Sequence, residues 1–309
     1  MQSTKIQNKK NAFALAIVIW IVAALLLGIA FIMNLAKDNL KITENLDEKL
    51  QTHLETLSFL EVLKYAMITS NYDSQSILLQ ESLPFDLPKQ LILDGRKYNI
   101  GKNIEFSLQD SSGQLSVFHP NFELIARFTT DDREKYFTIK DSIWDWIDKD
   151  NIVRLNGAES SFYKFKRSVS YGPRNYSAIQ SMDELQLING LYDLDKKEWD
   201  KVKSFMSIEG SPSLNVVLMK KKLLKKLLNL NSTEIDIIEA YKKTDIKKFY
   251  REMGTLGSFD NEFMGYALSF LIDVNLTIKK GISATHLESI IGFKEIQNDK
   301  ILVKSFKVY

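Results

Sequence analysis

The chain has 309 residues, of which 45% are hydrophobic and 26% charged, and these values are typical of globular rather than disordered proteins. Its 41 Lys and Arg exceed its 39 Asp and Glu by only two, so the total charge does not favour nucleic acid or anionic lipid as a partner. The absence of Cys excludes disulfides, thiolate metal sites and cysteine nucleophiles. The three His (His53, His119 and His286) are far apart, and no hydrolase or phosphate-loop motif is present. We therefore expect no catalytic residues and no enzyme activity.

One segment near the N-terminus is far more apolar than the rest of the chain. Residues 12–33 contain no charge, and at about 1.5 Å per residue they would reach about 33 Å, enough to cross a bilayer core. Lys5, Lys9 and Lys10 precede this run without an acid, which places the N-terminus in the cytoplasm and the remaining chain outside it. A cleaved secretory signal would be shorter and would end at a small-residue site. The sequence predicts a single-pass membrane anchor.

The pattern after the anchor indicates that the same helix continues into water. The first Pro is Pro84, and no Gly occurs between Gly28 and Gly95, so we expect a helix from about residue 13 to residue 70. Four leucines recur at helical spacing in its outer half: Leu46, Leu50, Leu54 and Leu57. This stripe needs a cover, which either a soluble domain or neighbouring copies would supply.

The remaining chain shows a β–α–β order of patterns. Short strands are predicted in residues 90–100 and 103–117, and longer ones at 266–279 and 300–308, with a turn or short helix at 285–291. Between them, amphipathic runs predict helices at 139–147, 181–188, 196–206, 216–228 and 233–250. The order predicts an α+β fold in which a large all-α domain interrupts an α/β head.

The densest local chemistry follows the helix predicted to end near residue 147. Three acids have the spacing of positions one, three and twelve of a calcium loop: Asp148, Asp150 and Glu159. Position six is Val153 where an EF-hand needs Gly, so the segment is not an EF-hand. A different oxygen-lined loop that includes Asn156, main-chain carbonyls or Asn175 remains possible. The alternative is a solvated acidic loop without an ion.

Two segments, residues 185–191 and 227–234, have the pattern of helix, tight turn and helix, which could present main-chain amides to phosphate. Lysines at 220–222 and 225–226 would supply charge for a nucleic acid. The first segment is surrounded by acids, and the head lies on the wrong side of the membrane for most nucleic acid. We therefore interpret the lysines as a solvated helix face and expect no nucleic-acid partner.

Several blocks of the sequence match motifs that occur together in one known family. Residues 9–20 (KKNAFALAIVIW) resemble a type IV prepilin processing site, where cleavage after Ala12 would leave Phe13 as the new N-terminus. A central block consists of 145–150 (DWIDKD), 157–159 (GAE), Tyr163, Tyr171, Asn175 and 183–185 (DEL), and two weaker blocks are residues 109–115 and 213–216. Taken together, these motifs resemble those of the K-type minor pseudopilins of the type II secretion system.

The resemblance implies a place in the filament. Most pilins and pseudopilins have Glu at the fifth mature position, where this chain has Ile17, and loss of that acid is typical of the K-type subunit. An acid there would pair with the terminal amine of a neighbouring subunit, offsetting buried charge in lipid. A subunit without the acid needs no neighbour above it, and a bulky inserted domain would block further stacking. The resemblance therefore implies a cap that starts pseudopilus assembly for export of folded proteins.

The resemblance also implies partners, location and a cofactor. The expected partners are the I-type and J-type minor pseudopilins, the major pseudopilin, prepilin peptidase and the inner-membrane assembly platform. The chain would cross the inner membrane once, with a methylated Phe13 after processing and the head in the periplasm. The family binds calcium in its helical domain, and the candidate ligands here are Asp148, Asp150, Asn156, Glu159 and Asn175. The rival hypothesis is a single-pass anchored extracytoplasmic binding protein that prepilin peptidase does not process.

On this interpretation the chain divides into six parts. They are a leader (1–12), the transmembrane part of the long helix (13–33), its extramembrane part with a linker (34–81), the first part of a pilin-like α/β head (82–130), the inserted helical domain (131–253) and the returning β part of the head (254–309).

Overall fold

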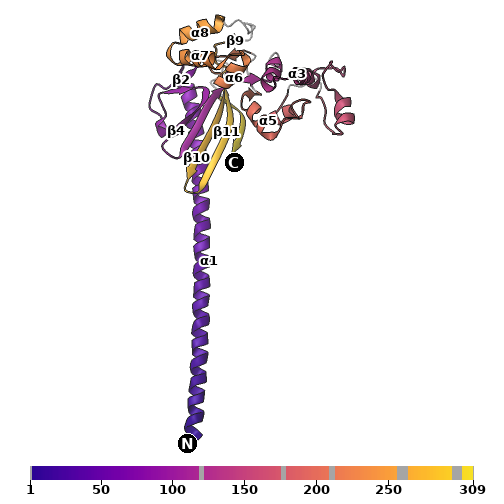
Figure 1. Cartoon of the computed structure of the whole chain (residues 1–309). Coiled ribbons are helices and arrows are strands. Elements are labelled where there is room, and N and C mark those ends of the chain that lie inside the picture. Colours follow the sequence, from indigo (N-terminus) through magenta and orange to yellow (C-terminus); the bar gives the residue numbers. More distant parts are fainter. Residues whose placement is uncertain are drawn as a thin grey trace. The chain divides into compact units, whose positions relative to one another are not determined.

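The computed structural model describes residues 2–117, 122–174, 179–208, 213–255, 264–293 and 301–308, with only the backbone described for residues 2–16, 301, 302, 304 and 305. It contains one long N-terminal helix, α1 (Gln2–Thr69), and a head of mixed helices and strands, which confirms the predicted α+β fold (Figure 1). The chain forms two compact units. The first consists of residues up to 57 with residues 278–285, and the second of residues 58–277 with 286–309. The predicted six-part division remains a prediction.

The first unit is dominated by α1, whose 68 residues correspond to about 100 Å of helix at the standard rise. It is the one helix of the described chain that is long and apolar enough to cross a membrane, with a mean hydropathy of 2.6 in its most apolar window and none of that window buried. The absence of Pro and the single Gly let the helix run unbroken to Thr69, close to the predicted end.

Within the same unit, a turn at residues 281–282 is tied to α1. The hydroxyl oxygens of Thr52 and Thr285 are 2.8 Å apart, and both side chains are buried. The backbone N–H of Ile282 donates to the Glu48 carboxylate at 3.2 Å. These contacts occupy the Thr52 face of the helix. Of the four leucines of the predicted stripe, Leu57 is half-buried, whereas Leu46, Leu50 and Leu54 are exposed, so the described chain leaves most of the stripe open.

Five strands of the described chain form a sheet in the order β12-β11-β10-β5-β4. Its strands are β4 (Asp94–Ile100), β5 (Ile104–Asp110), β10 (Leu271–Lys280), β11 (Ser283–Phe293) and β12 (Ile301–Val308). A smaller sheet joins β1 (Asn71–Tyr72), β2 (Ser76–Leu78) and β3 (Gln90–Ile92), and a 3-10 turn η1 (Pro84–Asp86) precedes β3. The last three turns of α1 bury Phe59, which lies 5.1 Å from the Phe106 ring of β5.

In the part of the head that the structure describes, seven α-helices follow, and the strands of two short parallel ladders flank them in the chain. They are α2 (Phe122–Thr129), α3 (Arg133–Ile147), α4 (Met182–Leu187), α5 (Lys196–Lys203), α6 (Lys221–Leu227), α7 (Ser232–Thr244) and α8 (Ile246–Thr255), with a π-helical turn η3 (Phe162–Lys166) after α3. The ladders pair β6 (Leu115–Ser116) with β7 (Met206–Ser207) and β8 (Leu214–Asn215) with β9 (Met264–Gly265). These helices share one core, which includes Trp146, Tyr163 and Leu224.

Three element predictions are wrong. Residues 285–291, expected as a turn or short helix, belong to strand β11. The helix expected from residue 216 begins at Lys221, because residues 216–219 form a buried turn pinned by the Asn215 side chain, which accepts from the Val217 N–H at 3.1 Å. The helix expected over 233–250 is two helices, since Asp245 has non-helical φ and ψ and ends α7.

Buried polar groups connect the two weaker motif blocks to the head. Asp110, at the end of β5 and before the 3-10 turn η2 (Ser111–Gly113), is fully buried. Its carboxylate accepts from the backbone N–H of Ser112, Ser269 and Phe270 at 2.9–3.1 Å and from two serine hydroxyls. Asn215 donates to the carbonyls of Ser74 and Ala267. These two side chains join distant segments of the head.

Candidate metal centre

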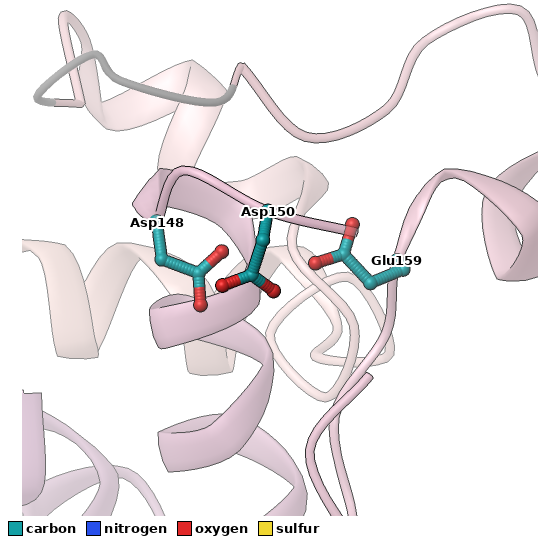
Figure 2. Close-up of side chains that lie close together, drawn as sticks. All are labelled: Asp148, Asp150 and Glu159. Carbon is teal, nitrogen blue, oxygen red and sulfur yellow. The ribbon is translucent and has the colours of Figure 1, made fainter. Parts of the chain in front are cut away.

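Three carboxylates converge at the end of α3. Asp148 ends the helix, because its backbone is extended while its N–H still donates to the carbonyl of Trp144 at 3.0 Å. Asp150 follows two residues later, and Glu159 lies just before η3. One carboxylate oxygen from each residue lies within 4.8 Å of the others, and Figure 2 shows the three groups gathered together. Carboxylate oxygens are the ligands preferred by hard divalent cations.

Two of these acids have oxygens with unmet hydrogen-bonding capacity. Within the part of the chain that the structure describes, Asp148 Oδ1 and Glu159 Oε1 are buried and accept no hydrogen bond. Glu159 is only 3% exposed, and its burial, followed by the negative charge of Asp145, raises its pKa to about 7. A buried carboxylate oxygen without a partner destabilises a fold unless a proton or a cation compensates it. A bound cation would therefore compensate the buried, unpartnered oxygens of this cluster.

An ion pair between Arg154 and Asp145 connects the loop to α3. Arg154 Nη1 donates to Asp145 Oδ1 at 3.0 Å and to Asp148 Oδ2 at 2.5 Å. Asp145 is fully buried and also accepts from the Arg154 backbone N–H at 3.2 Å. Its burial raises its pKa although the guanidinium acts in the opposite direction. Gly157 lies against this carboxylate so closely that a Cβ would overlap Asp145 Oδ2.

The other two candidate ligands have different positions. The backbone N–H and the side-chain Nδ2 of Asn156 both donate to Asp141 Oδ2 at 3.2 Å. The Asn156 side chain is therefore hydrogen-bonded to α3. Asn175 lies outside the described residues. The structure thus brings together three of the five candidates, Asp148, Asp150 and Glu159.

The aromatic and acidic residues of the central motif support both ends of this loop. Trp146 Nε1 donates to Glu184 Oε1 at 3.0 Å, and Arg174 Nε donates to the same oxygen at 2.8 Å. Tyr163 packs edge-on against Trp146 with ring centroids 5.2 Å apart, and its hydroxyl accepts from the Asn189 N–H at 3.0 Å. These contacts therefore hold α3, which precedes the loop, and η3, which follows it, in position.

Sequence reasoning missed Arg154 and Asp141. Arg154 is the one base among residues 150–159, a run that also contains Asp150 and Glu159, and a lone base among acids is a signal for an internal ion pair. Asp141 precedes Asp145 by four residues and Asp148 by seven, so the three lie on one face of α3. That helical spacing was the available signal for Asp141.

Comparison with known proteins identifies the same region. The family model for protein K of the type II secretion system matches residues 123–208, which contain α2, α3, the carboxylate loop and α5. A search of curated proteins finds no match.

A solved structure shares the fold of the chain. It is the crystal structure of the GspK–GspI–GspJ complex from the type 2 secretion system of enterotoxigenic Escherichia coli, with a TM-score of 0.53 and 13% sequence identity. The match covers 87% of this chain and 98% of the solved one. At this identity the likeness concerns the fold. The family model over residues 123–208 and the shared fold agree with the motifs of the sequence, and together they support a K-type minor pseudopilin of the type II secretion system.

Proposed function

We propose that this minor pseudopilin caps the tip of the pseudopilus and starts its assembly, without enzymatic activity, so that the growing filament exports folded proteins across the outer membrane. The main support for this proposal is Ile17. It lies on the apolar segment of α1, at the fifth position after the predicted cleavage at Ala12, and its side chain is 45% exposed. A carboxylate at this depth would need a neighbour's amine as partner, whereas an isoleucine is compatible with lipid or with another apolar helix.

The size of the head supports the same position. Helices α2 to α8 lie between residues 122 and 255 and add a bulky helical part to the head. A subunit of this kind is accommodated most easily where nothing stacks above it. The exposed leucine stripe of α1 leaves a surface for neighbouring helices below the tip.

The proposed partners follow from the family and from the solved relative. That structure is a complex of K-, I- and J-type proteins, and we extend this assembly to the present chain. The major pseudopilin, prepilin peptidase and the inner-membrane assembly platform complete the expected set. The head would lie in the periplasm, because the lysines before the apolar run retain the N-terminus in the cytoplasm.

The same proposal includes a bound calcium ion held by Asp148, Asp150 and Glu159. Support comes from the convergence of the three groups and from the buried, unpartnered oxygens of Asp148 and Glu159. A divalent cation would neutralise these oxygens and connect the end of α3 to the turn at η3. Its role would be structural, holding the helical domain in one conformation.

The experiment that tests the proposal is intact mass and N-terminal sequencing of the native membrane protein, from cells with and without prepilin peptidase. A peptidase-dependent start at Phe13, with methylation, would support a processed pseudopilin. A retained Met1 in both strains would overturn it and would favour an anchored binding protein that keeps its leader.

A further inference from the structure

A cavity of about 630 Å³ lies between α7 and the chain that leads from β2 to β4. Gln75, Gln90 and Asp94 line it from the strand side, and Glu239 and Lys242 line it from α7. Small-molecule sites in proteins have volumes of about 300–1,000 Å³, so the cavity is large enough for a ligand. None of its lining residues belongs to the candidate metal centre.

The α7 side of the cavity contains a buried base and a buried acid with unused hydrogen-bonding capacity. The Lys242 side chain is 8% exposed, and one of its three N–H donors is used by the Met219 carbonyl at 3.0 Å. Glu239 Oε1 lies 3.8 Å from Lys242 Nζ, which is too far for a hydrogen bond. This oxygen is buried and accepts no hydrogen bond from the part of the chain that the structure describes. A buried donor and a buried acceptor therefore lie side by side at the cavity.

The 3.8 Å separation fits a hydroxyl group between the two side chains. An oxygen about 2.8 Å from each of these atoms would accept from Lys242 Nζ and donate to Glu239 Oε1. A carboxylate ligand can only accept, and it would meet the like charge of Glu239. An ammonium ligand can only donate, and it would meet the like charge of Lys242. A hydroxyl does both without a charge.

The charges of the cavity wall also favour a neutral ligand. Arg96 donates through Nε and Nη2 to both carboxylate oxygens of Asp94, at 2.9 Å and 2.7 Å. Lys242 compensates Glu239 in the same way at longer range. Each acid of the wall is thus matched by a base, and the remaining base, Lys243, is exposed to solvent. Neither an anion nor a cation would find an unmatched buried charge here.

We propose that this cavity binds a neutral saccharide, one of whose hydroxyl groups bridges Lys242 and Glu239. The side-chain amides of Gln75 and Gln90 supply further donors and acceptors for the other hydroxyls. Gln90 is already oriented, because its Nε2 donates to Ser76 Oγ at 2.9 Å. Half-buried Ile92 offers an apolar contact to the C–H groups of a sugar ring.

A single water molecule would not fill this cavity. One water takes about 30 Å³, and the cavity is about twenty times larger. A molecule with several hydroxyls on one ring can satisfy Lys242 and Glu239 and occupy the remaining volume. The occupant would be a free sugar or the end of a longer glycan, since both present the same hydroxyls. The inference does not depend on the cation site or on the place of the subunit in the filament.

The test is saturation-transfer NMR on the full-length protein in micelles of a polyoxyethylene detergent, because glycoside detergents would compete for the site. The probes are the methyl glycosides of glucose, galactose, mannose and N-acetylglucosamine. We expect at least one of them to bind with a dissociation constant of about 10 mM or lower. Hydrogen exchange, measured by mass spectrometry at saturating sugar, should then slow in residues 90–96 and 236–244.

Glu239→Gln keeps the shape of the side chain and removes the charged acceptor, so it should weaken sugar binding about fivefold or more. Lys242→Met removes the donor and should abolish binding, with thermal unfolding as the check that this variant is folded. The matched control is Asp236→Asn, the same chemical change on the same helix. Asp236 is exposed, pairs with Lys221 and does not line the cavity, so its variant should bind with unchanged affinity.

Oligosaccharides of the sugar that binds distinguish the two sources. An oligosaccharide that binds as tightly as the methyl glycoside would identify the end of a glycan as the occupant, and one that does not bind would identify a free sugar. No binding of any probe at about 100 mM would overturn the inference. Sugar binding that Glu239→Gln leaves unchanged, or acetate or phosphate that displaces the sugar at lower concentration, would overturn it as well.

Discussion

Gly157 leaves the space that the buried Asp145 carboxylate fills, because a Cβ at this position would overlap Asp145 Oδ2. The carboxylate cannot retreat easily, since it is fully buried and bonded to Arg154. We therefore predict that Gly157→Ala lowers the free energy of unfolding by about 1–3 kcal/mol, the usual cost of overpacking. Urea unfolding of the full chain in detergent, followed by tryptophan fluorescence, measures the change.

The matched control is Gly254→Ala, because Gly254 lies in α8 and no atom lies within 4 Å of an added Cβ. This variant should be neutral or more stable by up to about 1 kcal/mol, as expected for Ala in a helix. Equal stability of the Gly157 and Gly254 variants would show that the carboxylate has room to move.

Glu159 makes the ion-free protein sensitive to pH. Its pKa is raised from 4.5 to about 7, so the folded state holds this proton to a higher pH than the unfolded state does. In EDTA the free energy of unfolding should fall as the pH rises from 4.5 to about 7, by as much as about 3 kcal/mol, and then level off. Glu159→Gln removes this titration, so we predict a variant that is more stable than the wild type above pH 7 and similar to it below pH 4.5.

Calcium should reverse that order, since the ion stabilises the ionised wild-type carboxylate and loses a ligand in the variant. Thermal unfolding in EDTA and in excess calcium, at both ends of the pH range, measures the four states. A wild-type protein whose stability above pH 7 is the same with and without calcium would contradict the role assigned to Glu159.

Among the secondary-structure elements, β5 and the segment before β10 are joined by one buried carboxylate. Asp110 accepts from the backbone of Ser269 and Phe270, which precede β10, and from Ser112 in η2. Replacement by Ala would remove the acceptor of these three N–H groups, of which that of Ser112 lies on a buried residue. We predict that Asp110→Ala lowers the free energy of unfolding by about 3 kcal/mol or more. Hydrogen exchange of residues 269–271, measured by mass spectrometry, should accelerate first.

A surface carboxylate in an ion pair supplies the comparison. Asp236 on α7 pairs with Lys221 and both side chains are more than half exposed, so Asp236→Ala should cost less than about 1 kcal/mol. If the two variants lose the same stability, Asp110 does not act as the joint between these segments.

The secondary structure shows where sequence patterns succeed and where they fail. The long helix and strand β12 could be predicted, because an unbroken run without Pro and an alternating pattern are local signals. Strand β11 could not, because its buried face contains Thr285 and Ser289 beside Leu287, which hides the apolar alternation. The turn at 216–219 was missed for the opposite reason: its residues are apolar and buried, but Asn215 prevents the helix that their pattern favours.

For the candidate metal site too, some features could be predicted from the sequence and others could not. Asp148, Asp150 and Glu159 lie within twelve residues, so their spacing alone could place them together. The engagement of Asn156 by Asp141 depends on how the loop folds back on α3, which no spacing rule supplies. The outward exposure of Leu155 likewise follows from Arg154 turning inward.

For the whole molecule, the decisive question is whether the fifth mature position faces a neighbour in the filament. Ile17 and Ile21 lie one helical turn apart on α1 and are 45% and 54% exposed, so an acid at either position meets the same kind of environment. An acid near the centre of a membrane helix costs about 2.5–3.5 kcal/mol unless a partner neutralises it. In the pilin pattern that the sequence resembles, the fifth position is the one whose acid would meet the terminal amine of another subunit.

At the tip no subunit lies above, and an acid at either position stays unpaired. We therefore predict that Ile17→Glu and Ile21→Glu reduce secretion of a reporter substrate to a similar degree in cells that lack their own K-type subunit, while Ile17→Leu secretes normally. Immunoblots of membrane fractions verify equal subunit levels. Inside the filament, by contrast, Ile17→Glu would gain the amine partner and remain active while Ile21→Glu fails. Such a selective tolerance would place the chain among the stacked subunits and remove it from the tip.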